Sequence, residues 1–352
     1  MKARIIAFYL PQYHPIPEND AWWGKGFTEW TNVGKAKPLY RGHYQPRVPA
    51  DLGYYDLRVP ETRQAQADMA RSYGVEGFMY WHYWFGGGKR LLERPFNEVL
   101  ARGEPDFPFA LAWANETWKA HGLTNRNTLI EQRYLGEQDY IDHFHAVLPA
   151  FRDRRYITVD GKPLFMVYKP LQHPDMPAFV GLWQRLAREN GLPGIYFVGQ
   201  ADVGQEQKIL RLGMDAACIF RMMECVNRRP FFKKAVQRIK INLFKHPRVF
   251  RYAEAARWFV GPEDARDDII PTIYSGWDHT PRSGCEGTVF SHYTPDVFER
   301  HVEQVLRAVE NKPASLKIVF VKSWNEWGEG NYMEPDRRYG LQFLERLKKC
   351  VE

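Results

Sequence analysis

Two glutamates near the end of the chain, Glu326 and Glu329, are the residues best suited to chemistry. They lie three positions apart in the segment 323–331 (SWNEWGEGN), beside two tryptophans, just after the apolar run Leu316–Val321. Cleavage of a glycosidic bond needs one group that protonates the leaving oxygen and another that acts on the anomeric carbon or activates a nucleophile. Indole rings stack on sugar faces and lower the local dielectric, which raises the pKa of a nearby acid. The segment therefore favours a carbohydrate-active enzyme with Glu326 and Glu329 as its catalytic pair, and a capping role is the alternative for either acid alone.

A second carboxylate candidate, Glu116 of the pair Asn115-Glu116, follows the apolar run Phe107–Trp113. Glu116 can donate a proton or bond a sugar hydroxyl, and the alternative is an N-cap of the next helix. Glu29 and Asp278 also have neighbouring tryptophans, and we expect them to bind substrate rather than to react. The predicted substrate-binding residues are aromatic and polar side chains, most of them near the ends of apolar runs: Tyr9, His14, Trp22, Trp23, Glu29, Trp30, Trp81, His82, Trp84, Trp113, Asn115, Glu116, Lys169, Trp277, Asp278, Arg282, Trp324, Asn325 and Trp327.

Metal binding has little support in the sequence. His14, His82 and His279 follow apolar runs, but no HxH or HExxH spacing is present. The four cysteines form no CxxC pair, so they are expected to be reduced thiols. We predict no metal site and no cofactor.

Eight short apolar runs alternate with stretches of helical periodicity, a pattern typical of a parallel sheet covered on both faces. The runs are Ile5–Leu10, Val75–Trp81, Phe107–Trp113, Leu164–Tyr168, Ile195–Gly199, Ala216–Phe220, Ile269–Tyr274 and Leu316–Val321, and the clearest helical stretches are Glu61–Tyr73, Gln138–Arg152, Ala178–Asn190 and Pro295–Glu310. Eight such units predict a (β/α)8 barrel that forms a single catalytic domain over residues 1–352, with a doubly wound sheet as the alternative. Catalytic residues of a barrel lie just after its strands, where the candidate residues gather.

Two long excursions interrupt this pattern: residues 11–60, after the first strand, and residues 221–262, a basic helical insertion between strands six and seven. Within 226–260, Glu254 is the one acid, and the formal net charge of the whole chain is +7. The same segment holds these Lys and Arg residues: Arg228, Arg229, Lys233, Lys234, Arg238, Lys240, Lys245, Arg248, Arg251 and Arg257. Apolar residues interleaved with these charges make the segment a candidate for peripheral contact with anionic lipid, and a solvated charged helix is the alternative. No nucleic-acid-binding motif accompanies the charge, so nucleic acid is not an expected partner.

The location of the protein is predicted from its apolar segments. The N-terminal run Ile5–Leu10 is too short for a signal peptide and passes straight into Pro11-Gln12. No segment approaches the roughly 20 apolar residues that span a bilayer. We expect a soluble cytoplasmic protein, with the basic segment as a candidate contact to the inner membrane surface.

Several motifs resemble a known family. The segments 8–15 (FYLPQYHP), 22–33 (WWGKGFTEWTNV) and 51–56 (DLGYYD) resemble the WbsX-type family, which is similar to glycoside hydrolase family 99. Further matching positions are Phe85, 88–93, 113–116, 276–282 and 324–330, so the resemblance spans residues 5 to 340.

The resemblance implies a (β/α)8 barrel that acts on bacterial surface polysaccharides such as O-antigen or capsule. WbsX-type proteins are commonly labelled glycosyltransferases, whereas the related hydrolase family contains endo-acting α-mannosidases and α-mannanases. Glu326 and Glu329 match that family's paired acids, of which the first takes a proton from the substrate's own 2-hydroxyl and the second acts as acid and then base, with retention. Gly328 departs from the histidine that is typical of the hydrolases.

Three functions follow as expectations. The first is a retaining glycoside hydrolase or transglycosylase that acts on an oligo- or polysaccharide, with a lipid-linked saccharide as a candidate form of the substrate. The second is a glycosyltransferase, although the sequence has neither a DxD motif nor a Rossmann glycine fingerprint. The third is a barrel that binds glycans without catalysis.

Overall fold

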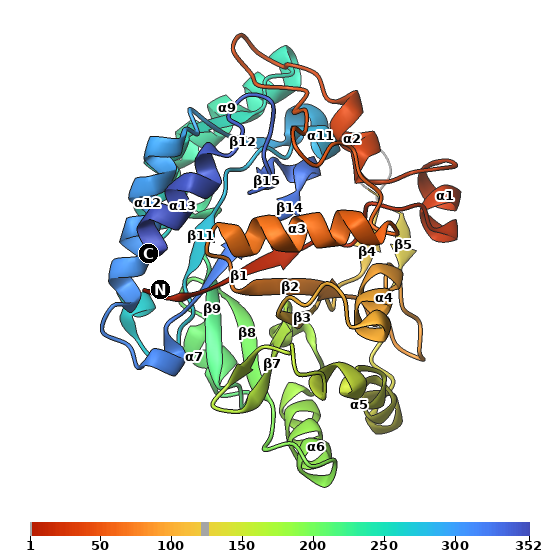
Figure 1. The fold of residues 1–352 in the computed structure, drawn as a ribbon. Helices are drawn as coiled ribbons and strands as arrows, with labels where there is room; N and C mark the ends of the chain where they lie inside the picture. The colour runs from red at the N-terminus through yellow and green to blue at the C-terminus, as the bar shows by residue number, and fades with distance from the viewer. Residues whose placement is uncertain (1, 121–126) are drawn as a thin grey trace.

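The computed structural model describes residues 2–120 and 127–352. Its core is a ring of parallel strands whose hydrogen-bonded order is β11-β13-β1-β2-β3-β7-β8-β9 (Figure 1). The strands are β1 (Arg4–Tyr9), β2 (Gly77–His82), β3 (Phe109–Trp113), β7 (Lys162–Val167), β8 (Tyr196–Asp202), β9 (Ala216–Phe220), β11 (Thr272–Tyr274) and β13 (Ile318–Lys322). Each strand falls on one of the predicted apolar runs.

The ring closes between β9 and the residues that precede β11. The amide of Ala217 donates to the carbonyl of Asp268 at 2.9 Å, and the amide of Ile270 donates to the carbonyl of Ala217 at 2.8 Å. These bonds join the two ends of the strand order, so the sheet is a nearly closed barrel. The predicted (β/α)8 fold is confirmed, and the doubly wound alternative is wrong.

Apolar side chains fill both faces of the barrel strands. The run IVFV at the start of β13 is buried along its whole length, as expected for a strand that has the barrel interior on one side and helices on the other. Inside the barrel, the ring of Phe8 stacks on Trp81 at 4.9 Å and meets Phe320 edge-on at 5.4 Å. These contacts join β1, β2 and β13, the strands that carry the candidate site.

Helices cover the outside of the barrel (Figure 1). The larger ones are α3 (Pro60–Ser72), α4 (Arg94–Arg102), α5 (Glu137–Phe151), α6 (Met176–Glu189), α12 (Pro295–Val309) and α13 (Gln342–Val351), with the short α7 (Glu206–Leu210) before β9. Helix α12 starts with proline at its first position, which the missing amide hydrogen permits. Its residues Phe298, Val302 and Val305 recur at intervals of three and four and are fully buried. This periodicity explains why the predicted and observed bounds of α12 agree within one residue.

The excursion after β1 carries two short helices, α1 (Pro17–Trp23) and α2 (Glu29–Lys35). Thr28 caps the start of α2, and its hydroxyl accepts from the amide of Trp30 at 3.2 Å. Further along, Pro49 forms a β-bridge with Asp336 near the C-terminal end of the chain. The excursion therefore folds back over the end of the barrel at which the strands finish.

The insertion at 221–262 is helical only in part. It contains α8 (Glu224–Asn227), α9 (Phe231–Phe244), the strand β10 (Arg248–Arg251) and α10 (Tyr252–Ala255). Strand β10 pairs in parallel with β12 (Thr288–Ser291). Tyr252 is fully buried, and its hydroxyl donates to the carbonyl of Tyr274 at 2.6 Å. The second half of the insertion is thus part of the fold, and α9 is the part that projects.

Candidate active site

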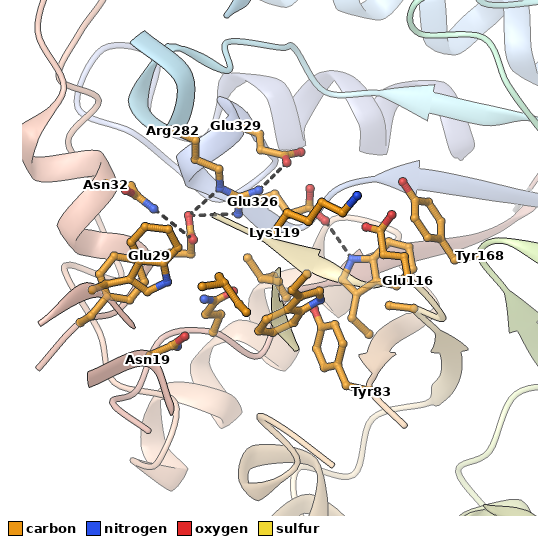
Figure 2. Close-up of a pocket in the computed structure, with 18 of the residues that line it drawn as sticks. Asn19, Glu29, Asn32, Tyr83, Glu116, Lys119, Tyr168, Arg282, Glu326 and Glu329 are labelled. Carbon is orange, nitrogen blue, oxygen red and sulfur yellow. Dashed lines mark hydrogen bonds and ion pairs between the residues drawn. The ribbon is translucent and has the colours of Figure 1, made fainter. Parts of the chain in front are cut away.

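A cavity of about 400 Å³ lies at the carboxyl ends of the barrel strands (Figure 2). Its lining comes from the excursion after β1, from β2 and the segments after β2, β3 and β7, from α11 (Thr280–Ser283) after β11, and from β13 with the segment that follows it. The short hairpin of β4 (Trp118–Lys119) and β5 (Thr128–Ile130) contributes Trp118 and Lys119. The cavity therefore lies at the carboxyl ends of the strands, where the sequence predicted the functional residues and where (β/α)8 enzymes have their active sites.

Glu326 and Glu329 reach this cavity from a tight hairpin. Strand β14 (Asn325–Glu326) pairs antiparallel with β15 (Asn331–Tyr332), and the 3₁₀ turn Trp327–Glu329 connects them. Gly330 ends the turn at a φ of 59°, where a Cβ would lie 2.7 Å from Cβ of Asp278. The turn brings both carboxylates onto the lining of one cavity, as the three-residue spacing predicted.

Glu326 is held between two donors. The indole Nε1 of Trp81 donates to its Oε1 at 2.8 Å, and Nζ of Lys322 lies 3.0 Å from its Oε2. Burial raises the pKa of Glu326, the Lys322 ammonium lowers it, and the neighbouring charge of Glu329 raises it again. Together these effects leave the pKa of Glu326 above its usual value, and the two donors fix the carboxylate in an orientation suited to accept a proton.

Glu329 shares a guanidinium with Glu29 (Figure 2). Nη1 of Arg282 pairs with Oε1 of Glu329, while Nη2 and Nε lie 3.0 and 3.1 Å from Oε2 of Glu29. Burial lowers the pKa of Arg282, but the charges of Glu29 and Glu329 outweigh this and hold the pKa above its usual range. Asn32 donates to the other oxygen of Glu29 at 3.3 Å. Arg282 thus fixes two acids that come from distant parts of the sequence.

Glu116 adds a further carboxylate to the cavity. It follows β3 and is half-buried. Burial raises its pKa, Lys169 lowers it, and the charge of Glu329 raises it. Glu116 is therefore more readily protonated than an exposed carboxyl, and it lies close enough to Glu329 for the two charges to interact.

The carboxylate of Glu29 explains why residue 328 is a glycine. A Cβ built on Gly328 would lie 2.1 Å from Oε2 of Glu29 and 3.2 Å from Nε of Arg282. The space that a side chain at 328 needs is filled by the Glu29 carboxylate, which is 3% exposed. In this chain, position 328 is thus glycine where the hydrolases typically have histidine, and the carboxylate of Glu29 from α2 occupies the adjacent space.

Part of the predicted binding set lines the cavity. The lining members are Trp23, Glu29, Trp81, Glu116 and Arg282, together with the predicted catalytic pair Glu326 and Glu329. Trp22 lies beside the lining, with its ring 6.1 Å from that of Trp118. Nζ of Lys169 lies 4.4 Å above the ring of Tyr168, which lines the cavity. These residues come from six separate segments of the sequence.

Three predicted binding residues are buried and bonded within the protein. The side-chain oxygen of Asn325 accepts from the amide of Leu10 at 2.7 Å, and its nitrogen donates to the carbonyl of Leu10 at 3.1 Å. The side-chain oxygen of Asn115 accepts from the amide of Lys169 at 2.7 Å, and its nitrogen donates to the carbonyl of Lys169 at 3.0 Å. Asp278 accepts from Nε2 of His43 at 2.7 Å, which lowers the Asp278 pKa against the effect of burial. These residues position the loops around the cavity, and they do not line it.

His82 is directed away from the cavity. Its Nε2 lies 2.8 Å from Nε2 of His143, and burial lowers its pKa to about 3, so the ring is neutral. Trp84 donates to Asp139 at 3.1 Å, and Trp113 donates to the carbonyl of Trp84 at 3.0 Å. This cluster joins β2 and β3 to α5 and supports the barrel wall.

The other predicted residues pack around the site without lining it. Tyr9 donates to Gln66 at 2.7 Å in the core. Nε1 of Trp30 donates to the carbonyl of Tyr55 at 2.7 Å, and the ring of Trp277 stacks on His279 at 5.5 Å. The remaining members, all of them buried, are His14, Trp324 and Trp327, and burial lowers the pKa of His14 to about 4.

Several lining residues were not predicted. Lys322 stands four residues before Glu326 at the end of β13, a position at which its pairing could have been anticipated. Tyr83 and Tyr168 also line the cavity, and they directly follow β2 and β7. The position of these three residues, at the end of a strand or directly after it, was the signal that could have identified them.

Glu334 is a buried acid that no sequence pattern marked. It accepts from the hydroxyl of Tyr55 at 2.9 Å, from Nε2 of Gln66 at 2.6 Å and from Nε1 of Trp327 at 2.6 Å. Burial raises its pKa to about 7, although these donors lower it. Glu334 anchors Trp327, the first residue of the turn that carries Glu329.

One group of side chains in the described part of the chain has the composition of a metal site, namely Glu299, Glu303 and Cys350. It belongs to α12 and α13 and does not line the cavity. Glu299 is already paired with Arg346 at 2.9 Å and Lys349 at 2.6 Å. The group is better described as an ion-pair network between two helices.

Known structures share this architecture. A glycoside hydrolase-like protein superimposes with a TM-score of 0.58 at 16% identity, over 99% of this chain and 94% of the other. The GH99 endo-α-mannosidase from Bacteroides thetaiotaomicron superimposes with a TM-score of 0.57 at 16% identity, over 99% and 96%. At this level of identity the likeness concerns the fold, a barrel used by glycoside hydrolases.

The sequence defines the family. Residues 5–347 match the family described as glycosyltransferase WbsX, and the chain belongs to it. The chain is also 37% identical over 358 residues to the protein WxcX from Xanthomonas campestris pv. campestris strain B100, across 100% of this chain and 50% of WxcX. It therefore spans about half the length of this relative. The predicted family resemblance is confirmed.

Proposed function

We propose that this protein is a retaining glycoside hydrolase or transglycosylase that acts on a bacterial surface polysaccharide. The observation that carries the proposal is the pair of carboxylates, Glu326 and Glu329, on one cavity but with different partners. Glu326 is bonded to an indole and an ammonium, and Glu329 to a guanidinium shared with Glu29. Two acids in different environments can take different proton-transfer roles.

The short spacing of the acids favours participation by the substrate. In the ordinary two-carboxylate mechanism the acids flank the scissile bond. Here they project from one hairpin, so the attacking group is better supplied by the sugar. Glu326 takes the proton of the 2-hydroxyl, and that oxygen attacks the anomeric carbon as the glycosidic bond breaks. Glu329 gives its proton to the leaving oxygen, and an epoxide-like sugar remains.

The second half of the reaction reverses the proton transfers. Glu329, now ionised, takes a proton from water or from a glycan hydroxyl, whose oxygen attacks the anomeric carbon. The epoxide C–O bond breaks, and Glu326 returns its proton to the 2-oxygen, so the configuration is retained. Arg282 stabilises the ionised form of Glu329 between the two steps. Hydrolysis and transglycosylation differ only in the acceptor.

The first test replaces the two acids. Glu326→Gln and Glu329→Gln should each lower turnover of a cleavable glycoside by about two to four orders of magnitude, the scale of acid–base catalysis. Glu310→Gln, an exposed acid beyond α12, is the matched control and should retain wild-type turnover. Unchanged turnover in both acid variants, with the fold intact by circular dichroism, would refute the assignment.

The second candidate is a glycosyltransferase, and the description of the family favours it. A donor phosphate would meet the cationic side chains of the cavity, among them Lys35, Lys119 and Arg282. Parallel incubations with nucleotide sugars and with cleavable glycosides separate the two reactions. Nucleotide release without glycoside cleavage would establish the transferase, whereas retained glycan affinity without either product would indicate a binding protein.

A further inference from the structure

Helix α9 has its apolar side outward. Of its 14 residues, Gln237 is buried and Ile241, one turn later, is half-buried, so this side faces the protein. The opposite side presents a stripe at the spacing i, i+4, i+7 and i+11, which lies on one face of a helix. The stripe consists of Phe232, Val236, Ile239 and Leu243, which are 63, 50, 53 and 71% exposed. An ordinary surface helix has the reverse arrangement, with its apolar side against the core.

Positive charge surrounds this stripe. Between Cys225 and Ala253 the chain has no Asp or Glu. Lys233 and Lys240 are exposed on the helix beside the stripe. An amphipathic helix with large apolar residues on one side and Lys or Arg on the other is the form that lies in the interface of an anionic bilayer.

Helix α9 is attached at the end of the barrel that holds the cavity. It follows the carboxyl end of β9, and the ring of His246 after it lies 5.2 Å from the ring of Tyr40 in the excursion after β1. Figure 1 shows this excursion, in red-orange, reaching the teal helix α9. The next strand, β10, pairs with β12, which forms a bridge with Asp278. A surface bound by α9 therefore adjoins the segments that frame the cavity.

We propose that the outward stripe of α9 binds the surface of an anionic bilayer and holds the cavity beside it. The apolar side chains enter the acyl boundary, and the lysines and arginines meet the lipid phosphates. Pairing with a second copy is disfavoured, because a two-fold contact between stripes would bring the same positive charges together. No helix in the described residues is long and apolar enough to cross a membrane, so the attachment is interfacial. It does not depend on the chemistry proposed for the cavity.

Vesicle co-sedimentation tests the proposal with the whole chain. We expect binding to vesicles of equal phosphatidylcholine and phosphatidylglycerol and much weaker binding to phosphatidylcholine alone. Raising the salt from about 0.1 M to about 1 M should weaken binding, because the Debye length falls from about 10 to about 3 Å. Binding that ignores both the anionic lipid and the salt would overturn the proposal.

Two variants separate the apolar and ionic contributions. Ile239→Asp with Leu243→Asp should lower binding at least about tenfold, since each residue loses a buried aliphatic contact. Lys233→Gln with Lys240→Gln should lower it about fivefold per residue, the equivalent of ~1 kcal/mol per cation near the surface. Lys208→Gln with Arg211→Gln, two exposed cations near α7, is the matched control and should bind like the wild type.

Sedimentation velocity tests the alternative that the stripe binds a second copy of the chain. Because the α9 variants alter exposed positions, we expect them to keep the wild-type melting temperature. A concentration-dependent dimer that the Ile239→Asp, Leu243→Asp variant abolishes, without vesicle binding by the wild type, would assign the stripe to a second copy and refute the proposal. Undiminished vesicle binding by that variant would refute it as well.

Discussion

Replacing Gly328 with alanine tests how the acids of the cavity are held. The new Cβ would lie 2.1 Å from Oε2 of Glu29, well inside van der Waals contact, so the carboxylate must move. That oxygen is also the one that Arg282 contacts at 3.0 and 3.1 Å. Overpacking of a tight site costs about 1–3 kcal/mol. We expect Gly328→Ala to lower the free energy of unfolding by about this amount and to reduce turnover, because Arg282 then loses one of its two acids.

A double-mutant cycle isolates the cause. Glu29→Ala removes the atoms that clash with the new Cβ, so the double variant should be at least about 1 kcal/mol more stable than the two single effects predict by addition. Unfolding in urea, followed by tryptophan fluorescence, gives each free energy. Gly181→Ala is the control, since nothing lies within 4 Å of its Cβ in α6, and it should raise stability by about 0.5–1 kcal/mol. Additive effects in the cycle, or a neutral Gly328→Ala, would refute the steric argument.

Two further predictions concern pH. Lys322 lowers the pKa of Glu326, so Lys322→Met should raise this pKa and move the acid limb of the kcat/KM profile to higher pH; an unmoved limb would contradict the role of Glu326 as base. Glu334 has its pKa raised from 4.5 to about 7 in the folded protein, so the folded state keeps a proton that the unfolded state has lost between these values. Its contribution to stability is full below pH 4.5 and falls as the pH rises to about 7, by up to ~3 kcal/mol. Urea unfolding at pH 5 and pH 7 should show that Glu334→Gln reduces this decline, and an equal decline in variant and wild type would exclude Glu334 as its source.

The order of strands and helices could be predicted from the sequence, because each element is marked by a local pattern of apolar residues. Each barrel strand is a short run of apolar, often β-branched residues, and the helices between them repeat their apolar positions every three or four residues. Helix α12 even has its starting proline in the expected place. Eight alternating units leave few architectures other than a barrel.

The roles of single side chains were less readable, because an exposed polar residue and a buried, bonded one look alike in sequence. Asn115 and Asn325 stand beside the acids of the cavity, yet their amides bond the backbone of other segments. His82 ends strand β2, at the edge where site residues gather, but it contacts His143 of α5. Which side of a loop faces the cavity depends on how distant segments pack.

The sequence by itself determined the barrel, the family and the position of the acid pair, since these rest on periodicity and on a contiguous motif. Only the tertiary structure decided which distant side chains contact each acid: Trp81 for Glu326, and Arg282 for Glu329. The tertiary structure also showed that Gly328 makes room for an acid some 300 positions earlier in the chain. These contacts join segments whose proximity depends on closure of the barrel, and electrostatic interactions follow distance in space rather than distance along the chain.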